Sequence, residues 1–228
     1  MPLIAKHATT GERLDITTVD RPRQTWMPGD IICPLCGGGM IVKAGLIKIP
    51  HFAHRNICTT DYKCHPESAE HIAGKMFVAK MVKEHTAEWQ YEGHSIEFEY
   101  PVKEIKRVID VALLFPSGWI IAHEVQLAGI TTEELQERTD DYLRAGIDVI
   151  WWLGNNANTP SNSQWLSNRY GAYHSIHFTQ SRNRRDQVLI GEMDTGMGRT
   201  TVSQHMGTGE NGKEMDTGVK NGVMPVHT

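Results

Sequence analysis

The chain has 228 residues with a formal net charge of −4, and 39% of its residues are hydrophobic. This length allows one sizeable hydrophobic core, or a main domain with a small satellite, and excludes several large domains. No apolar run approaches the roughly 20 residues of a membrane-spanning helix, so we expect no membrane contact. The negative charge argues against a protein that coats nucleic acid by bulk attraction, so phosphate contacts would have to come from local patches or metal ions.

Residues 1–7 contain no charged segment followed by a long apolar stretch. No secretory signal is therefore expected, and the predicted location is cytoplasmic. In a reducing compartment, the four cysteines of the chain favour metal binding or redox chemistry over a disulfide framework.

Residues 1–66 have the pattern of a small, loop-rich domain. Short extended runs at Ile31–Ile32 and Met40–Val42 alternate with glycine and proline, and all four cysteines fall in this stretch. A domain of this size buries little apolar surface and commonly needs a structural metal to fold stably.

Two cysteines and two histidines of this domain have spacings that suit zinc. Cys33-x2-Cys36 is followed by His51-x2-His54, and two thiolates with two imidazoles form a closed, tetrahedral structural site. The histidines are closer together than in the familiar zinc finger, so the fourth position is open between His54 and three further residues. Those three are Cys58, Cys64 and His65. A redox Cys-x-x-Cys is expected at a strand-to-helix junction, and the glycines that follow Cys36 open no helix.

The middle of the chain alternates helical and extended patterns. In chain order we predict a helix over 67–88, strands over 95–98, 107–115 and 119–127, a helix over 132–145 and a strand over 147–153. Gly146 is expected to end the second helix, and this helix is expected to cross over between two parallel strands. Trp151 and Trp152 lie in an apolar strand and are predicted to belong to the core rather than to stack on bases.

The C-terminal residues 191–228 are rich in Gly, Thr and Met and lack hydrophobic periodicity. We predict a disordered tail, which leaves a central domain over 67–190. The tail repeats the sequence Glu-Met-Asp-Thr-Gly, so a peptide tag for a partner protein is the alternative.

Two acidic residues stand in otherwise apolar strands, where an unpaired carboxylate would be costly to bury. A short turn between the strands puts Asp110 and Glu124 nearly opposite each other, and Gln126 lies on the face of Glu124. Either carboxylate alone would fit a salt bridge, for example to Arg107, or an exposed edge. Two carboxylates in one cleft repel unless a cation lies between them, and oxygen ligands of this kind suit Mg²⁺ or Mn²⁺, which usually act on phosphates.

Polar side chains also share faces of the two helices. Glu67, His71 and Lys75 are spaced four residues apart, on a face distinct from the apolar stripe of the first helix. Arg138 and Tyr142 have the same spacing on the second helix. A solvated surface is the alternative explanation for both groups.

Taken together, the helix with Glu67, the three strands and the second helix before a buried strand resemble the PD-(D/E)xK nuclease core. Within that superfamily the sequence resembles the competence protein CoiA family. The matching pieces occur in order between Ile31 and Leu153. They are Cys33–Cys36, His51–His54, Glu67–His71 with Lys75, Asp110–Val111, Glu124–Gln126, Glu137–Tyr142 and Ile150–Leu153.

The resemblance implies an α/β fold with a PD-(D/E)xK nuclease-like core and a small N-terminal zinc-binding module. It implies a metal-dependent DNA nuclease that acts in DNA uptake, processing or recombination, in which Asp110 and Glu124 bind Mg²⁺ or Mn²⁺ and Glu67 is a third acidic contributor. The usual lysine of the superfamily is replaced by Gln126, whose neutral amide can orient a water but supplies no charge. We hypothesise that Lys75 or a second metal ion supplies it, with His71 nearby on the same helix face.

The alternative function is a recombination accessory protein that binds DNA, or a recombination-protein partner, without cutting. Gln126 is the feature that keeps this alternative open. A third reading, a zinc-ribbon adaptor that binds protein through its tail, has less support.

Overall fold

The computed structural model describes residues 2–45, 49–62, 67–88, 90–171, 173–180, 188–195 and 198–205. Two of the alternative zinc ligands, Cys64 and His65, lie outside these ranges. The described residues include no helix that is both long enough and apolar enough to cross a bilayer.

The chain divides into two compact units. The first contains Met1–Glu124 and Asp140–Val149, and the second contains Val125–Thr139 and the chain from Ile150 onward. This division does not follow the domain limits that the sequence suggests after residues 66 and 190, and those limits stay predictions.

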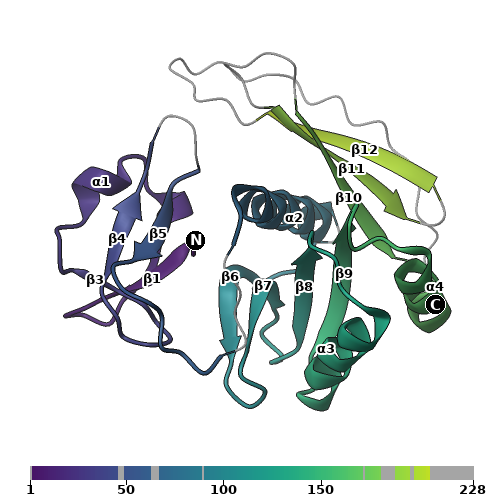
Figure 1. The fold of residues 1–228 in the computed structure, drawn as a ribbon, viewed down its shortest axis with the longest axis horizontal. Coiled ribbons are helices and arrows are strands. Elements are labelled where there is room, and N and C mark those ends of the chain that lie inside the picture. The colour runs from purple at the N-terminus through teal and green to yellow at the C-terminus, as the bar shows by residue number, and fades with distance from the viewer. Residues whose placement is uncertain are drawn as a thin grey trace. The chain divides into compact units, whose positions relative to one another are not determined.

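The first unit begins with short strands (Figure 1). Strands β1 (Ile4–His7), β2 (Arg13–Asp15) and β3 (Ile31–Ile32) form an antiparallel sheet in the order β2-β1-β3, and β4 (Met40–Lys43) pairs with β5 (His51–His54). A 3₁₀ turn, Ile16–Thr18, and a short helix α1, Pro22–Thr25, connect β2 to β3. The predicted extended runs at 31–32 and 40–42 are confirmed, whereas β1, β2 and β5 were not predicted.

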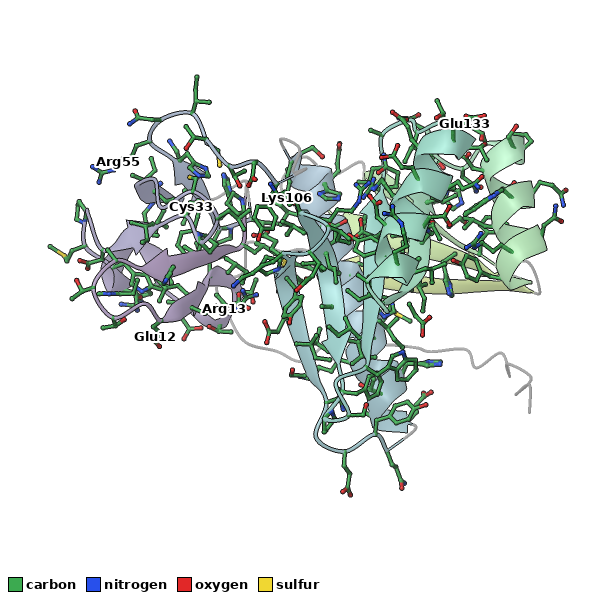
Figure 2. The ribbon with its side chains drawn as sticks, turned by 90° about the horizontal axis from the view of Figure 1, so that it is seen from below. Glu12, Arg13, Cys33, Arg55, Lys106 and Glu133 are labelled. Carbon is green, nitrogen blue, oxygen red and sulfur yellow. The ribbon has the colours of Figure 1, made fainter. Side chains whose placement is uncertain are left out.

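These strands share a hydrophobic core with the first long helix, α2 (Ala69–Glu88). The buried cluster combines residues of both parts, namely Leu3, Ala5, Leu14, Ile16, Ile31, Cys33, Met40, Phe52 and Ile72. Arg13, labelled in Figure 2, adds a polar link, because it donates to the carbonyl of Phe98 and lies 3.5 Å from the carboxylate of Glu97. Residues 1–66 therefore supply most of this core, and Ile72 of α2 adds to it.

The predicted order of helix, three strands, helix and strand is present. After α2 come β6 (Ser95–Val102), β7 (Arg107–Leu114), β8 (Ile120–Gln126), α3 (Thr132–Arg144) and β9 (Asp148–Gly154). Gly146 follows α3 with φ +72°, the left-handed conformation that commonly ends helices. Trp151 and Trp152 are buried, which confirms them as core residues.

The strands β6, β7 and β8 form an antiparallel meander in the first unit. Phe98 pairs with Val111, and Val111 pairs with His123 on the other side. Within the first unit the strand order is β8-β7-β6, and within the second it is β12-β11-β10-β9. Along the chain, α3 connects β8 to β9.

The C-terminal part of the chain contains elements that the sequence analysis lacks. Helix α4 (Pro160–Tyr170) is capped by Thr159, whose side chain accepts a hydrogen bond from the backbone of Asn162. Strand β10 (His174–Gln180) pairs in parallel with β9, and β11 (Val188–Thr195) and β12 (Gly198–His205) continue antiparallel.

The structure therefore differs from the expected tail over 191–195 and 198–205, which are strands. Both strands are paired along their backbones, and the run 199–203 contains Thr and Val, which have high β-propensity. Residues 206–228, the rest of the expected tail, lie outside the described part of the chain.

Candidate functional site

Three predicted site residues come together where the start of α2 meets β7. Glu67 lies just before the helix, His71 in its first turns, and Asp110 in the strand, and one ligand atom of each lies within 4.8 Å of the others. The imidazole lies between the carboxylates, with Nδ1 3.1 Å from Glu67 Oε1 and Nε2 3.3 Å from Asp110 Oδ2. Ser68 fixes the helix start, because its hydroxyl accepts the backbone N–H of His71 at 3.1 Å.

The electrostatics of this trio favour positive charge between the carboxylates. Burial alone would lower the pKa of His71, but the charge of Asp110 and hydrogen bonds to both carboxylates raise it to about 10. Burial likewise opposes ionisation of Glu67, yet His71 and Lys75 lower the pKa of its carboxyl. A site that holds an imidazolium between two ionised carboxylates has the ligand chemistry to accept a divalent cation in place of the proton.

Lys75 lies one turn further along α2 and is fully buried. Its ammonium is 2.5 Å from Glu67 Oε1 and 2.6 Å from Glu99 Oε1. Burial alone would lower the pKa of Lys75, but the two carboxylates raise it above its usual value. The solvated-face alternative is thus wrong for Lys75, whose charge compensates two buried acids.

Glu99 on β6 is the member of this group that the sequence analysis missed. Glu97 and Glu99 alternate with apolar residues, and this pattern indicates a solvent-facing strand face. Instead, burial raises the pKa of Glu99 while the charge of Lys75 acts against that rise. No sequence signal distinguishes Glu99, whose side chain is 13% exposed, from Glu97, whose side chain is 33% exposed.

Asp110 and Glu124 occupy adjacent strands, as predicted. The register that pairs Val111 with His123 brings the next residues, Asp110 and Glu124, opposite each other. Glu124 Oε1 lies 3.3 Å from the backbone nitrogen of Asp110 and accepts the Tyr142 hydroxyl at 2.9 Å. Glu124 is not part of the trio of described residues that meet within 4.8 Å. An ion shared by Asp110 and Glu124 therefore stays a prediction.

Tyr142 on α3 is almost fully buried, so the surface-stripe alternative is wrong for this residue. One turn earlier on the same helix, the Arg138 guanidinium donates to Gln126 Oε1 at 2.8 Å and lies 4.8 Å from the centre of the Trp151 ring. The other end of the Gln126 amide donates to the carbonyl of Ala128 at 2.9 Å. Arg138 and Tyr142 are four residues apart on α3. They bind the side chains of Gln126 and Glu124, which are two residues apart on β8.

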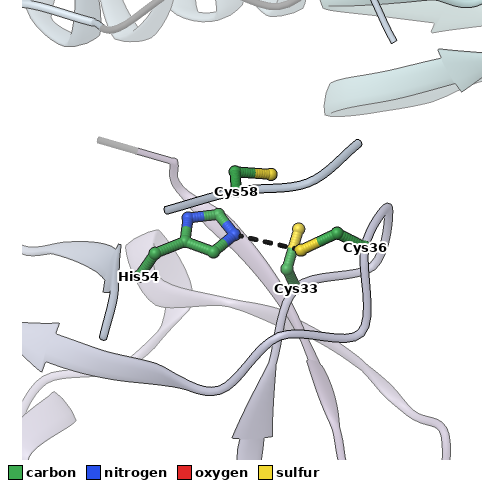
Figure 3. A group of neighbouring side chains, drawn as sticks. All are labelled: Cys33, Cys36, His54 and Cys58. Atoms are coloured by element: carbon green, nitrogen blue, oxygen red, sulfur yellow. Dashed lines mark hydrogen bonds between the residues drawn. The ribbon is translucent and has the colours of Figure 1, made fainter. Parts of the chain in front are cut away.

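A second cluster lies in the N-terminal part of the first unit (Figure 3). Cys33 and Cys36 come from the turn after β3, His54 ends β5, and Cys58 follows in the next loop, with all four ligand atoms within 4.8 Å of one another. Cys36 Sγ is 3.5 Å from His54 Nε2. The turn suits a thiolate pair, because backbone N–H groups of Leu35 and Gly38 point at the two sulfurs, each at 3.4 Å.

The two thiols of the turn differ in acidity. Burial raises the pKa of Cys33 to about 12. At Cys36, burial alone would raise the pKa of the thiol. Hydrogen bonds from two backbone N–H groups and from His54 instead lower this pKa to about 6. Three sulfurs and one imidazole are a common ligand set for structural zinc, so the residues present fit this ion.

This cluster differs from the predicted ligand set of Cys33, Cys36, His51 and His54. Among the described residues, Cys58 completes the cluster and His51 does not belong to it. His51 and His54 lie three positions apart in β5, so their side chains point to opposite faces of the strand and cannot both reach one ion. His51 Nδ1 is instead 2.8 Å from the carbonyl of Ile49.

Two family models match the chain. Residues 67–194 match "Competence protein CoiA, nuclease-like domain", and residues 24–61 match "Competence protein CoiA, N-terminal domain". The chain belongs to the competence protein CoiA family. The Glu67–His71–Asp110 trio thus lies in the nuclease-like domain of a CoiA family member, and the Cys₃His cluster lies in its N-terminal domain.

Among curated relatives, Competence protein CoiA of Bacillus subtilis (strain 168) is 34% identical over 122 residues. The match covers 54% of this CoiA family chain and 31% of the relative, so the chain spans less than a third of the length of that protein.

Two solved structures resemble the chain at low scores. Pyrococcus furiosus SfsA in complex with Ca²⁺ has 14% identity and a TM-score of 0.32, and covers 61% of this chain and 70% of its own. A repair endonuclease from Pyrococcus abyssi has 17% identity and a TM-score of 0.29, and covers 58% and 62%. Neither likeness carries weight in the functional proposal.

The hydrogen bond from Tyr142 to Glu124 should contribute measurably to stability. We expect Tyr142→Phe to lower the free energy of unfolding by about 1–3 kcal/mol, because it removes a donor from a buried carboxylate. Urea unfolding followed by circular dichroism measures this change. Tyr170→Phe is the matched control, because that side chain is exposed and its free energy of unfolding should hardly change. Equal unfolding midpoints for Tyr142→Phe and the wild type would contradict the assigned role of the hydroxyl.

Proposed function

We propose that this CoiA family member is a metal-dependent deoxyribonuclease that hydrolyses DNA phosphodiester bonds during DNA uptake, processing or recombination. The observation that carries the proposal is the meeting of Glu67, His71 and Asp110 within 4.8 Å, inside the residues that match a nuclease-like domain. Carboxylates on a helix and a neighbouring strand can bind Mg²⁺ or Mn²⁺, with oxygens left for waters and a phosphate.

In this proposal Asp110 and Glu124 are the metal ligands, and Glu67 is the third acidic contributor. The bound ion would supply an acidified water and stabilise charge on the phosphate oxygens. The chain itself holds the geometry: Tyr142 orients Glu124, and Lys75 orients Glu67. Before metal binding, the protonated imidazole of His71 lies between Glu67 and Asp110. It is close enough to both carboxylates to exchange its proton with them.

The order of α2, β6, β7, β8, α3 and β9 supports a PD-(D/E)xK-type core for the proposed nuclease. The Cys₃His cluster is proposed to hold structural zinc, and its role would be to fasten the loops of the N-terminal part. In the same scheme the charge of Lys75 is compensated by Glu67 and Glu99. The positive charge at the reacting phosphate would therefore come from a metal ion.

The second candidate is a DNA-binding accessory protein of recombination that does not cut. The observation in its favour is Gln126, which stands where the superfamily has lysine and whose amide is engaged by Arg138 and Ala128. An amide held at both ends supplies no charge, and only one N–H donor and one acceptor lone pair remain to orient a reacting water.

Incubation with DNA separates the two candidates. Purified protein is mixed with linear and circular DNA, single-stranded and double-stranded, with Mn²⁺, with Mg²⁺ or with EDTA. The nuclease proposal predicts cleavage of at least one substrate with metal and no cleavage with EDTA. Retarded DNA that stays intact at saturating Mn²⁺ would favour the accessory protein and refute the nuclease.

A further inference from the structure

We infer that Glu99 is a positioning residue of the metal site, which sets the strength of Glu67 as a ligand through Lys75 and joins this pair to strand β1. The inference deepens the proposed function and rests on it, because it assigns Glu99 an effect on cation binding. Every contact that carries it lies within the first compact unit.

The contacts of Glu99 are directed and partly buried. Its Oε1 lies 2.6 Å from Lys75 Nζ and accepts the backbone N–H of Leu3 at 2.7 Å. Its Oε2 accepts the backbone N–H of Ile4 at 3.2 Å. A single carboxylate thus binds the ammonium of α2 and two backbone groups next to or within β1.

The backbone at Glu99 has an uncommon conformation. Its φ is +52°, in the left-handed region that residues with a Cβ seldom adopt. The pairs on either side, Phe98 with Val111 and Tyr100 with Ile109, keep one register, so the left-handed conformation falls on a residue within the ladder of β6 and β7. This residue is the one that binds Lys75. Strain of this kind persists where the surrounding contacts determine it, and it is common at functional sites.

One ammonium serves two carboxylates in this arrangement. Lys75 Nζ is shared by Glu99 and Glu67, and Glu67 in turn contacts His71, which reaches Asp110. If Glu99 loses its charge, the positive charge of Lys75 is compensated by Glu67 alone. Glu67 then becomes a poorer ligand, because its charge is drawn towards the ammonium and away from the cation.

The same carboxylate connects the metal site to the Cys₃His cluster. Strand β1 is paired with β3, whose end leads into Cys33, and the carbonyl of Pro2 accepts the N–H of Phe52 in β5, which ends at His54. Two of the cluster residues therefore anchor the strands that hold β1 in place for Glu99. Through this path the N-terminal domain supports the cation site of the nuclease-like domain.

Mn²⁺ binding to the full chain tests the inference without relying on cleavage. Free Mn²⁺ is measured by electron paramagnetic resonance during titration of the wild type, Glu99→Gln and Glu97→Gln. We expect about tenfold weaker binding for Glu99→Gln, the size typical of residues that orient metal ligands. Glu97→Gln is the matched control on the same strand, since Glu97 pairs with Arg13 rather than Lys75, and its affinity should equal that of the wild type. Cleavage by Glu99→Gln should need about tenfold more Mn²⁺ for half-maximal rate and keep its rate at saturation.

Equal Mn²⁺ affinity of folded Glu99→Gln and wild type would overturn the inference and leave the proposed function standing. Failure of the wild type to bind Mn²⁺ would instead overturn the proposed function, and the inference with it. If Glu99→Gln does not fold, the wild type provides the test by nuclear magnetic resonance. Titration with Mg²⁺ should then shift the amide signals of Leu3 and Ile4 at the midpoint of cation binding, and their constancy throughout the titration would refute the coupling.

Discussion

Asp110→Asn should abolish metal-dependent DNA cleavage, with a loss of about a thousandfold or more in rate. The substitution keeps the shape of the side chain but removes the charge that binds the cation and faces His71. Because the amide is nearly isosteric, the far-ultraviolet circular dichroism spectrum should match that of the wild type. Glu124→Gln should cause a comparable loss, because Glu124 is the second proposed ligand.

Asp148→Asn is the matched control for this experiment. Asp148 is exposed at the start of β9 and accepts a hydrogen bond from the indole of Trp119 at 2.8 Å. It undergoes the same chemical change in the same compact unit, so its cleavage rate should stay close to that of the wild type. Wild-type turnover by Asp110→Asn at saturating Mn²⁺ would show that Asp110 is not a ligand of the ion.

Cys58→Ser should remove zinc from the N-terminal domain and produce the largest loss of stability among these variants. Structural zinc sites contribute about 10 kcal/mol or more of apparent binding free energy, and this energy is coupled to folding. Loss of one thiolate from the Cys₃His set should therefore destabilise the strands around it by several kcal/mol. The measurements are the zinc content per chain by mass spectrometry and the thermal unfolding of the purified protein.

His51→Asn provides the control and also distinguishes the two ligand sets. His51 was predicted from its spacing as a ligand, whereas the structure directs it to the carbonyl of Ile49 and puts Cys58 in the cluster. We expect His51→Asn to retain one zinc ion per chain, with a modest loss of stability. Loss of zinc from His51→Asn, with zinc retained in Cys58→Ser, would restore the ligand set inferred from spacing.

The order of the central elements could be predicted because each has a local signal. The apolar residues of α2 recur at helical spacing, Gly146 ends α3, and β9 is a short apolar run between turn residues. Strands that depend on distant partners gave no such signal. Strand β1 has only four residues. Strands β11 and β12 are held by backbone pairing with β10 and with each other, and hydrophobic alternation does not mark them in the sequence.

The candidate site divides in the same way. Glu67, His71 and Lys75 could be grouped because helical periodicity alone puts them on one face. The pairing of Tyr142 with Glu124 requires α3 to pack against β8, so spacing suggested the residue but not its contact. Glu99 was not predicted because strand alternation puts it on an exposed face. The left-handed backbone at this residue has no sequence signature. His51 entered the predicted ligand set by its spacing alone, without regard to the strand in which it lies.

Anomalous diffraction from crystals soaked in Mn²⁺ is the most direct test of a divalent cation held by the acidic residues of the nuclease-like domain. We expect one strong peak within about 2.2 Å of a carboxylate oxygen of Asp110, with an oxygen of Glu124 or Glu67 as a further ligand. Absence of a peak at Asp110 at saturating Mn²⁺, or a peak bound only by other residues, would contradict the proposed metal site.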